Sequence, residues 1–117
     1  MSRRRDQTAG SLIPDEARAA VLAEILKSVA HPLRLRIIAL LCERDATVSE
    51  LTDELDARQA IVSQQLRILR LHRLVAVGHR DGRPVYRLAE QQLRHLVACM
   101  NRCDAGAVVA APRRSSR

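Results

Sequence analysis

The chain has 117 residues, which suits one domain with short tails, and 47% of them are hydrophobic, which excludes a disordered polymer. Aromatic residues make up only 1%, with Tyr86 alone, which argues against a protein that stacks single-stranded bases on aromatic side chains. The formal net charge of +7 predicts attraction to a polyanion, which could be DNA, RNA or an acidic membrane surface.

The sequence shows neither the pattern of a signal peptide nor that of a membrane span, and this bears on where the protein is expected to act. No apolar run follows the arginines near the N-terminus, and no stretch approaches the roughly 20 apolar residues of a membrane span. The three cysteines are odd in number and widely spaced, unlike the disulfide framework of a secreted domain. We therefore expect a cytoplasmic protein without a membrane segment, its thiols reduced by default.

The chain divides into an arm, one domain and a tail. Residues 1–12 are polar and small and predict a disordered arm, residues 13–104 form the domain, and residues 105–117 predict a flexible tail. A first helix is expected to begin at Pro14, with acidic residues beside its N-terminus. A second helix, from Pro32, is apolar on two opposite faces, which is typical of the buried middle of a bundle.

Two short helices are expected next. Thr47 and Glu50 have the spacing of a capping box, which predicts a helix over about residues 48–55. After a break at Asp56–Ala57, a helix from Gln59 to Leu71 is expected, with Ile61 or Val62, Leu66 and Leu69 facing inward. Two short helices with a tight break predict a helix-turn-helix.

A hairpin and a last helix follow. "RDGR" is a hairpin turn signal between two short apolar runs, and it places arginines at the tip. The helical period then returns, with one apolar face formed by Leu93, Leu96, Val97 and Met100. The predicted fold is mainly α with a small β-hairpin, a winged helix-turn-helix.

Four segments in order, "SVAHPLRLRIIALL", "VSELTDEL", "RQAIVSQQLRILRLHRLV" and "RDGRPVYRL", resemble the ArsR/SmtB family of small bacterial repressors. The likeness covers about residues 20–103. It implies a homodimer formed by the first and last helices, binding to double-stranded operator DNA, and release from DNA when an inducer binds.

The resemblance also assigns the DNA contacts. The second helix of the helix-turn-helix would enter the major groove, where Gln can pair with adenine and Ser with several bases. Arginines further along this helix would meet phosphate, and those on the wing would contact the flanking backbone or the minor groove. The alternative is a merely solvated helix surface. The expected contacts are Gln59, Ala60, Ser63, Gln64, Arg67, Arg70, Arg80 and Arg83.

One position departs from the family. Many members have Ser where this chain has Arg58, and a guanidinium has no oxygen to accept the N–H bond of a helix cap. The wording "RQAxVSQQL" instead resembles the branch of the family that senses sulfide and oxidants through thiols.

The two usual metal sites of the family are not expected here. Cysteines that begin the helix near Val48 in relatives are replaced by Thr47 and Ser49. The Asp and His pairs of the last helix are replaced by other residues, among which Gln and Gly are poor or absent ligands. The positions that replace them are Glu90, Gln92, Cys103 and Gly106.

The remaining sensor candidates are Cys42, Cys99 and Cys103. A disulfide or polysulfide bridge from Cys42 to Cys99 or Cys103 would suit a redox sensor. Three thiolates would suit a soft ion such as As(III) or Cu(I), and no other cofactor is indicated. All three could instead be small buried apolar residues. The layout resembles the thiol-sensing branch out of register, because its cysteines fall on Ala39 and near Ala105.

Other classes of function are less well matched. No phosphate loop, catalytic triad or paired carboxylate cluster stands out, so an enzyme is not expected. A module that has lost DNA binding would have no need of its arginines. A DNA-binding subunit whose signal comes from a partner protein remains an alternative.

Overall fold

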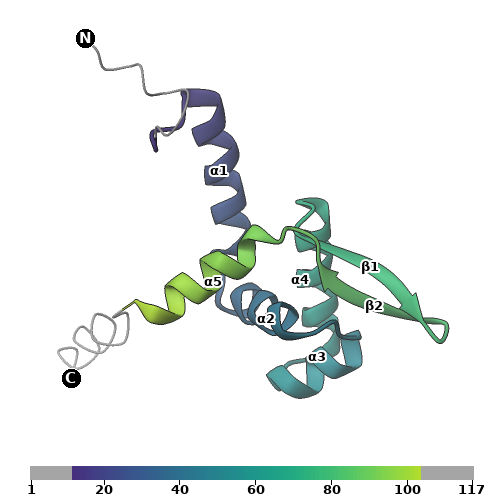
Figure 1. The fold of residues 1–117 in the computed structure, drawn as a ribbon. Helices are drawn as coiled ribbons and strands as arrows, with labels where there is room; N and C mark the ends of the chain where they lie inside the picture. The colour runs from purple at the N-terminus through teal and green to yellow at the C-terminus, as the bar shows by residue number, and fades with distance from the viewer. Residues whose placement is uncertain (1–11, 104–117) are drawn as a thin grey trace, which may run out of the picture.

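The computed structural model describes residues 12–103, so most of the expected arm and all of the expected tail lie outside the described residues. The elements follow one another as two helices, a helix-turn-helix, a hairpin and a closing helix, which confirms the predicted fold class (Figure 1). In chain order they are α1 (Glu16–Val29), α2 (Pro32–Glu43), α3 (Val48–Leu55), α4 (Gln59–Leu71), β1 (Val75–Arg80), β2 (Arg83–Leu88) and α5 (Gln92–Arg102).

The first two helices begin with side-chain caps. The side chain of Asp15 accepts the N–H of Arg18 at 2.8 Å, so α1 begins at Glu16, two residues later than Pro14 had suggested. The prediction for α2 is confirmed, with Pro32 in its first turn. The Nδ1 atom of His31 caps this helix by accepting an N–H at 3.1 Å.

The helix-turn-helix has the predicted bounds. The Thr47–Glu50 capping box is formed in both directions, with bonds of 2.9 and 3.1 Å. Asp56 ends α3 in the left-handed conformation, with φ of 51°. Arg58 occupies the N-cap of α4 without a side-chain hydrogen bond, as expected of a side chain that only donates.

The core is centred on α2, which lies between α5 on one side and α3 and α4 on the other (Figure 1). From α4 the residue that faces inward is Val62, which is fully buried, whereas Ile61 is 40% exposed. Leucine, isoleucine and valine make nearly all of this core, because the chain offers a single aromatic residue. Its fully buried large side chains are Ile37, Ile38, Leu41, Leu51, Val62, Leu66, Leu69 and Leu74.

The hairpin forms a wing that projects from the helices (Figure 1). Its strands pair antiparallel, and the turn residues Asp81 and Gly82 have φ of 55° and 77°, the combination that a two-residue primed turn requires. Two backbone bonds of 2.7 and 3.0 Å between Ala46 and Tyr86 fix the wing to the loop before α3. Over residues 12–103, no helix has the length and apolarity needed to cross a membrane.

The end of α4 contains a strained residue. The N–H groups of Arg73 and Leu74 donate to the carbonyls of Arg70 and Leu69 at 2.9 and 3.0 Å, which is a Schellman motif. Arg73 therefore has a φ of 61°, a conformation that costs a residue with a Cβ about 1 kcal/mol. We expect Arg73→Gly to raise the free energy of unfolding by about 1 kcal/mol in urea titrations. Arg73→Ala keeps the Cβ and should show no gain; an equal gain would assign the effect to the arginine side chain.

Candidate nucleic-acid interface and cysteine sites

Helix α4 has one buried face and one exposed face. Val62, Gln65, Leu66 and Leu69 are buried, so the opposite side of the helix faces solvent. Ser63 is half-buried at the border between the faces. The other residues expected to contact DNA from this helix are all exposed: Gln59, Ala60, Gln64, Arg67 and Arg70.

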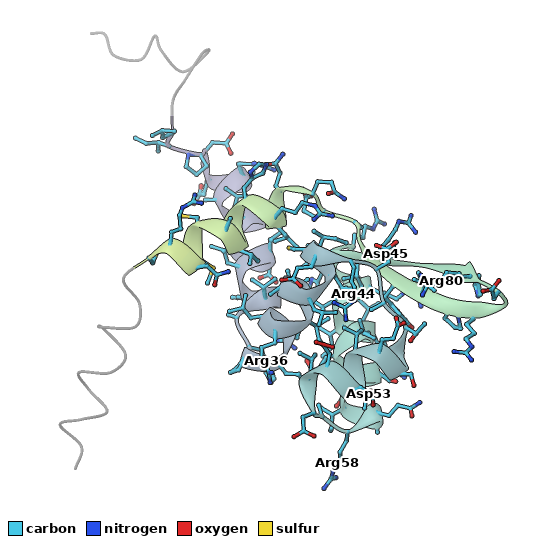
Figure 2. The ribbon with its side chains drawn as sticks, turned by 60° about the horizontal axis from the view of Figure 1, so that its bottom comes forward. Arg36, Arg44, Asp45, Asp53, Arg58 and Arg80 are labelled. Atoms are coloured by element: carbon cyan, nitrogen blue, oxygen red, sulfur yellow. The ribbon has the colours of Figure 1, made fainter. Side chains whose placement is uncertain are left out.

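The N-terminal end of α4 is open. Figure 2 shows Arg58 projecting away from the body of the protein at this end. Because no side chain caps the first turn, its backbone N–H groups are available to an acceptor, and the helix dipole favours a negative one. A cation at an uncapped helix N-terminus is unfavourable in the free protein and becomes favourable when an anion binds there.

The wing presents arginines beside the start of α3. Arg80 and Arg83 are exposed on the two strands at the turn, and Figure 2 shows Arg80 on the outer part of the hairpin. The guanidinium of Arg80 lies 3.8 Å from the carboxylate of Glu50, and both side chains are about half exposed. The pKa of Glu50 is lowered, first by the backbone N–H of Thr47 and then by Arg80. An ion pair this exposed is weak, so Arg80 can exchange Glu50 for another anion.

A partly buried polar contact, which the sequence pattern did not predict, joins α2 to α4. Arg34 donates to the side chain of Gln65 at 3.0 Å, and Gln65 is 8% exposed. The Nε atom of Arg34 is buried without a hydrogen-bond partner. Gln65 shares its helical row with Val62 and Leu69, so that spacing was the available signal. The contact fixes how α4 is turned about its axis relative to α2.

The cysteines lie in two environments. Cys42 is half-buried in the last turn of α2, where the guanidinium of Arg94 from α5 donates to its carbonyl oxygen. Burial raises the pKa of the Cys42 thiol, and the nearby charge of Arg94 opposes that rise. Cys99 and Cys103 are exposed, Cys103 as the C-cap of α5. Because its pKa is raised, a smaller fraction of the Cys42 thiol is ionised near neutral pH than of an unperturbed thiol, which slows its attack on another sulfur.

The Arg94 contact shows where α5 passes the end of α2. At about 1.5 Å of rise per residue, Cys99 lies about 7.5 Å further along α5 than Arg94, and Cys103 about 13.5 Å further. A disulfide requires Cα atoms within about 7 Å. Within one protomer, Cys99 is thus nearer than Cys103 to Cys42.

Two residues at the positions of the family's usual metal ligands take part in hydrogen bonds at the starts of helices. The hydroxyl of Thr47 is used in the capping box of α3, and a carboxylate oxygen of Glu90 accepts the N–H of Gln92 at 3.1 Å. In the part of the chain from 12 to 103, no group of three or more His, Cys, Asp or Glu side chains could hold a metal ion. Gly106 lies outside the described residues.

An apolar face extends over α1 and α5. A cavity of about 460 Å³ opens there and has an almost wholly apolar lining. Leu26 and Met100 on its rim are 52% and 40% exposed, and Val21 on α1 is 49% exposed. Side chains of this size leave apolar area in water that a second protein surface could cover. The lining residues are Leu26, Val29, Ala30, His31, Pro32, Leu35, Leu96 and Met100.

Known repressors are similar to this chain in sequence. The biofilm growth-associated repressor of Agrobacterium fabrum is 38% identical over 85 residues, which are 73% of each chain. The HTH-type transcriptional repressor SmtB of Mycobacterium tuberculosis is 44% identical over 75 residues, 63% of this chain and 55% of the relative. This chain therefore spans about half the length of SmtB.

A solved structure agrees with the sequence matches. The transcriptional repressor BigR from Xylella fastidiosa superposes with a TM-score of 0.66 at 34% identity, over 73% of this chain and 84% of that one. Residues 31–77, from the cap of α2 into the wing, match the description "Bacterial regulatory protein, arsR family". The chain belongs to the arsR family of bacterial regulatory proteins.

Proposed function

We propose that this protein is a transcriptional repressor that binds double-stranded operator DNA as a homodimer and acts in the cytoplasm. The observation that carries the proposal is the division of α4 into a buried apolar face and an exposed polar one, with an open N-terminus. The arginines on the wing add positive charge on a second element. The relatives named as repressors support the direction of regulation.

Each exposed side chain has a proposed role. Gln59 and Gln64 would pair with adenine edges in the major groove, and Ser63 and Ala60 would approach neighbouring bases. Arg67 and Arg70 lie further from the N-terminus of α4 and would bind phosphates that set the register. On the wing, Arg80 and Arg83 would contact the flanking backbone.

The homodimer is supported by the apolar face of α1 and α5. An operator that is read by two equal recognition helices has two half-sites about one helical turn apart. A second copy covering the apolar cavity would hold two α4 helices at a fixed spacing. The proposed dimer therefore serves both stability and recognition.

We further propose that the inducer acts through thiols. An exposed thiol, Cys99 or Cys103, would attack an organic polysulfide first, and the half-buried Cys42 would then close a disulfide or polysulfide bridge. The first attack, on the sulfane sulfur of R–S–S–S–R, would break one S–S bond and release R–S⁻. The attack of the Cys42 thiolate would then break a second S–S bond and release R–S⁻ if a trisulfide bridge forms, or R–S–S⁻ if a disulfide forms, so the released sulfur carries away the two electrons lost by the thiols. Cys99 and Cys103 are the two alternative partners of Cys42, within one protomer or across the proposed dimer. A soft ion such as As(III) or Cu(I), or a partner protein, is the second candidate signal.

Fluorescence anisotropy on the DNA upstream of its own gene tests the proposal. Reduced, metal-free protein should bind tightly, with affinity falling steeply as salt rises, because phosphate contacts release counterions. An organic polysulfide should lower the affinity of the wild type and leave Cys42→Ser bound. Cys103→Ser should still respond if Cys99 is the partner.

The outcomes separate the two parts of the proposal. Failure to bind the duplex at any salt would overturn the repressor assignment. Tight binding that polysulfide leaves unchanged would overturn only the thiol switch. Soft ions, and then a partner protein, would next be tested on the same duplex.

A further inference from the structure

Ile61 is a large apolar side chain that the core does not use. It is 40% exposed, although its neighbour Val62 is fully buried. Leu71, at the far end of α4, is 75% exposed. The two lie ten residues apart, which is about 15 Å along the helix axis. The two side chains are similar in size and lie at opposite ends of α4, so substitution of Leu71 can serve as a control for substitution of Ile61.

Ile61 lies at the end of α4 that a helix-turn-helix inserts among base edges. It is the third residue of the helix, three positions before Gln64, and residues so spaced are neighbours on a helix surface. Gln64 is exposed, and Arg58 projects from the same end of the helix (Figure 2). The first turns of a recognition helix carry the residues that touch bases. Ile61 and Gln64 therefore present an apolar group and an amide to the same region.

A thymine–adenine pair offers the complementary groups. In the major groove, thymine presents its C5-methyl group, and its partner adenine presents the N6 and N7 atoms that a glutamine amide can bind. No other base pair presents a methyl group there. Contact with this methyl would also remove apolar surface of Ile61 from water, which is favourable.

We propose that Ile61 is a specificity-determining residue that packs on the C5-methyl group of a thymine in the operator, at or beside the adenine that Gln64 reads. This inference rests on the proposed function, since it requires α4 to occupy the major groove. It adds a large apolar contact to the base-reading end of α4, where the other expected contacts are the amides of Gln59 and Gln64, the hydroxyl of Ser63 and the small side chain of Ala60. Leu71, far from the base-reading end, has no such contact.

Substitution of deoxyuridine for thymine tests the contact, because it removes the methyl group and nothing else. The probe is a duplex that the wild type selects from a random-sequence library, with each thymine replaced singly. Wild-type affinity, measured by anisotropy at fixed salt, should fall about fourfold at one position of each half-site, the value of one buried methyl group. Ile61→Ala should bind the thymine and deoxyuridine duplexes equally.

Leu71→Ala is the matched control and should keep the wild-type response to deoxyuridine. Thermal unfolding of both variants checks that each is folded. A deoxyuridine penalty that persists in Ile61→Ala would overturn the inference, as would a wild type indifferent to every replacement or a selected half-site without thymine. Those results leave the repressor assignment intact, whereas failure to select any duplex would overturn both.

Discussion

Leu66→Ala is expected to lower the free energy of unfolding by about 2–5 kcal/mol. Leu66 is 1% exposed and belongs to the row of α4 that packs on the core. Truncation removes buried methyl groups and leaves a cavity that the surrounding leucines and isoleucines fill only in part. Because small domains are stable by only about 5–15 kcal/mol, the variant should unfold at clearly lower urea concentration.

Leu71→Ala makes the same chemical change on the same helix, on its exposed face. With 75% of its surface in water, this leucine should be replaceable within about 0.5 kcal/mol. Leucine and alanine both favour helix, so helix propensity contributes little to either variant and the difference between them reports mainly burial. If both variants lost the same free energy of unfolding, the side of α4 that contains Leu66 would not be the side packed on the core. The polar face assigned to DNA would then be wrong.

Local signals predicted the helix-turn-helix and the wing. Thr47 and Glu50 satisfy each other's backbone groups at the start of α3, so the sequence identifies that end without tertiary information. Asp81 and Gly82 both tolerate positive φ, and that property alone selects the turn of the wing. The start of α1 was wrong by two residues, because Pro14 and Asp15 are both common at helix starts. The hydrogen bond of Asp15 decides between them.

Contacts between elements were beyond local signals. Ile61 and Val62 are adjacent and both fit a helical spacing, so only packing on α2 and α3 decides which is buried. The bond between Arg34 and Gln65 joins residues 31 positions apart. The sequence around Arg34 does not indicate a partner on α4, and the sequence around Gln65 does not indicate one on α2, so local patterns could not predict this contact.

The sensor was the least predictable part. Ala39, where the thiol-sensing branch has its cysteine, lies in the groove that Val97 and Met100 of α5 also line. Cys42 lies one turn later, beside Arg94. A shift of three residues along α2 thus changes which residues of α5 lie near the thiol. The spacing of cysteines along one chain also cannot show whether a cysteine of a second protomer lies near Cys42.

Leu26→Glu is expected to convert the proposed dimer to a monomer and to weaken operator binding by about 100-fold or more. Leu26 is 52% exposed on α1, at the apolar cavity that Leu35, Leu96 and Met100 also line. A carboxylate buried in such an interface without a partner costs far more than the interface gains there. Sedimentation velocity would measure the mass, and anisotropy on the selected duplex would measure the affinity.

The loss of DNA affinity follows from the loss of the second half-site. Two recognition helices held together bind with an avidity 10²–10⁴ above that of one, the order of magnitude that bivalent binding supplies. Leu71→Glu places the same charge at another exposed leucine, on α4, and should leave the mass of the dimer unchanged. Circular dichroism should show both variants folded, because each leucine has at least half of its surface in water in the protomer. If Leu26→Glu remained dimeric, the dimer interface would not lie on α1. The half-site spacing inferred from that interface would then be wrong as well.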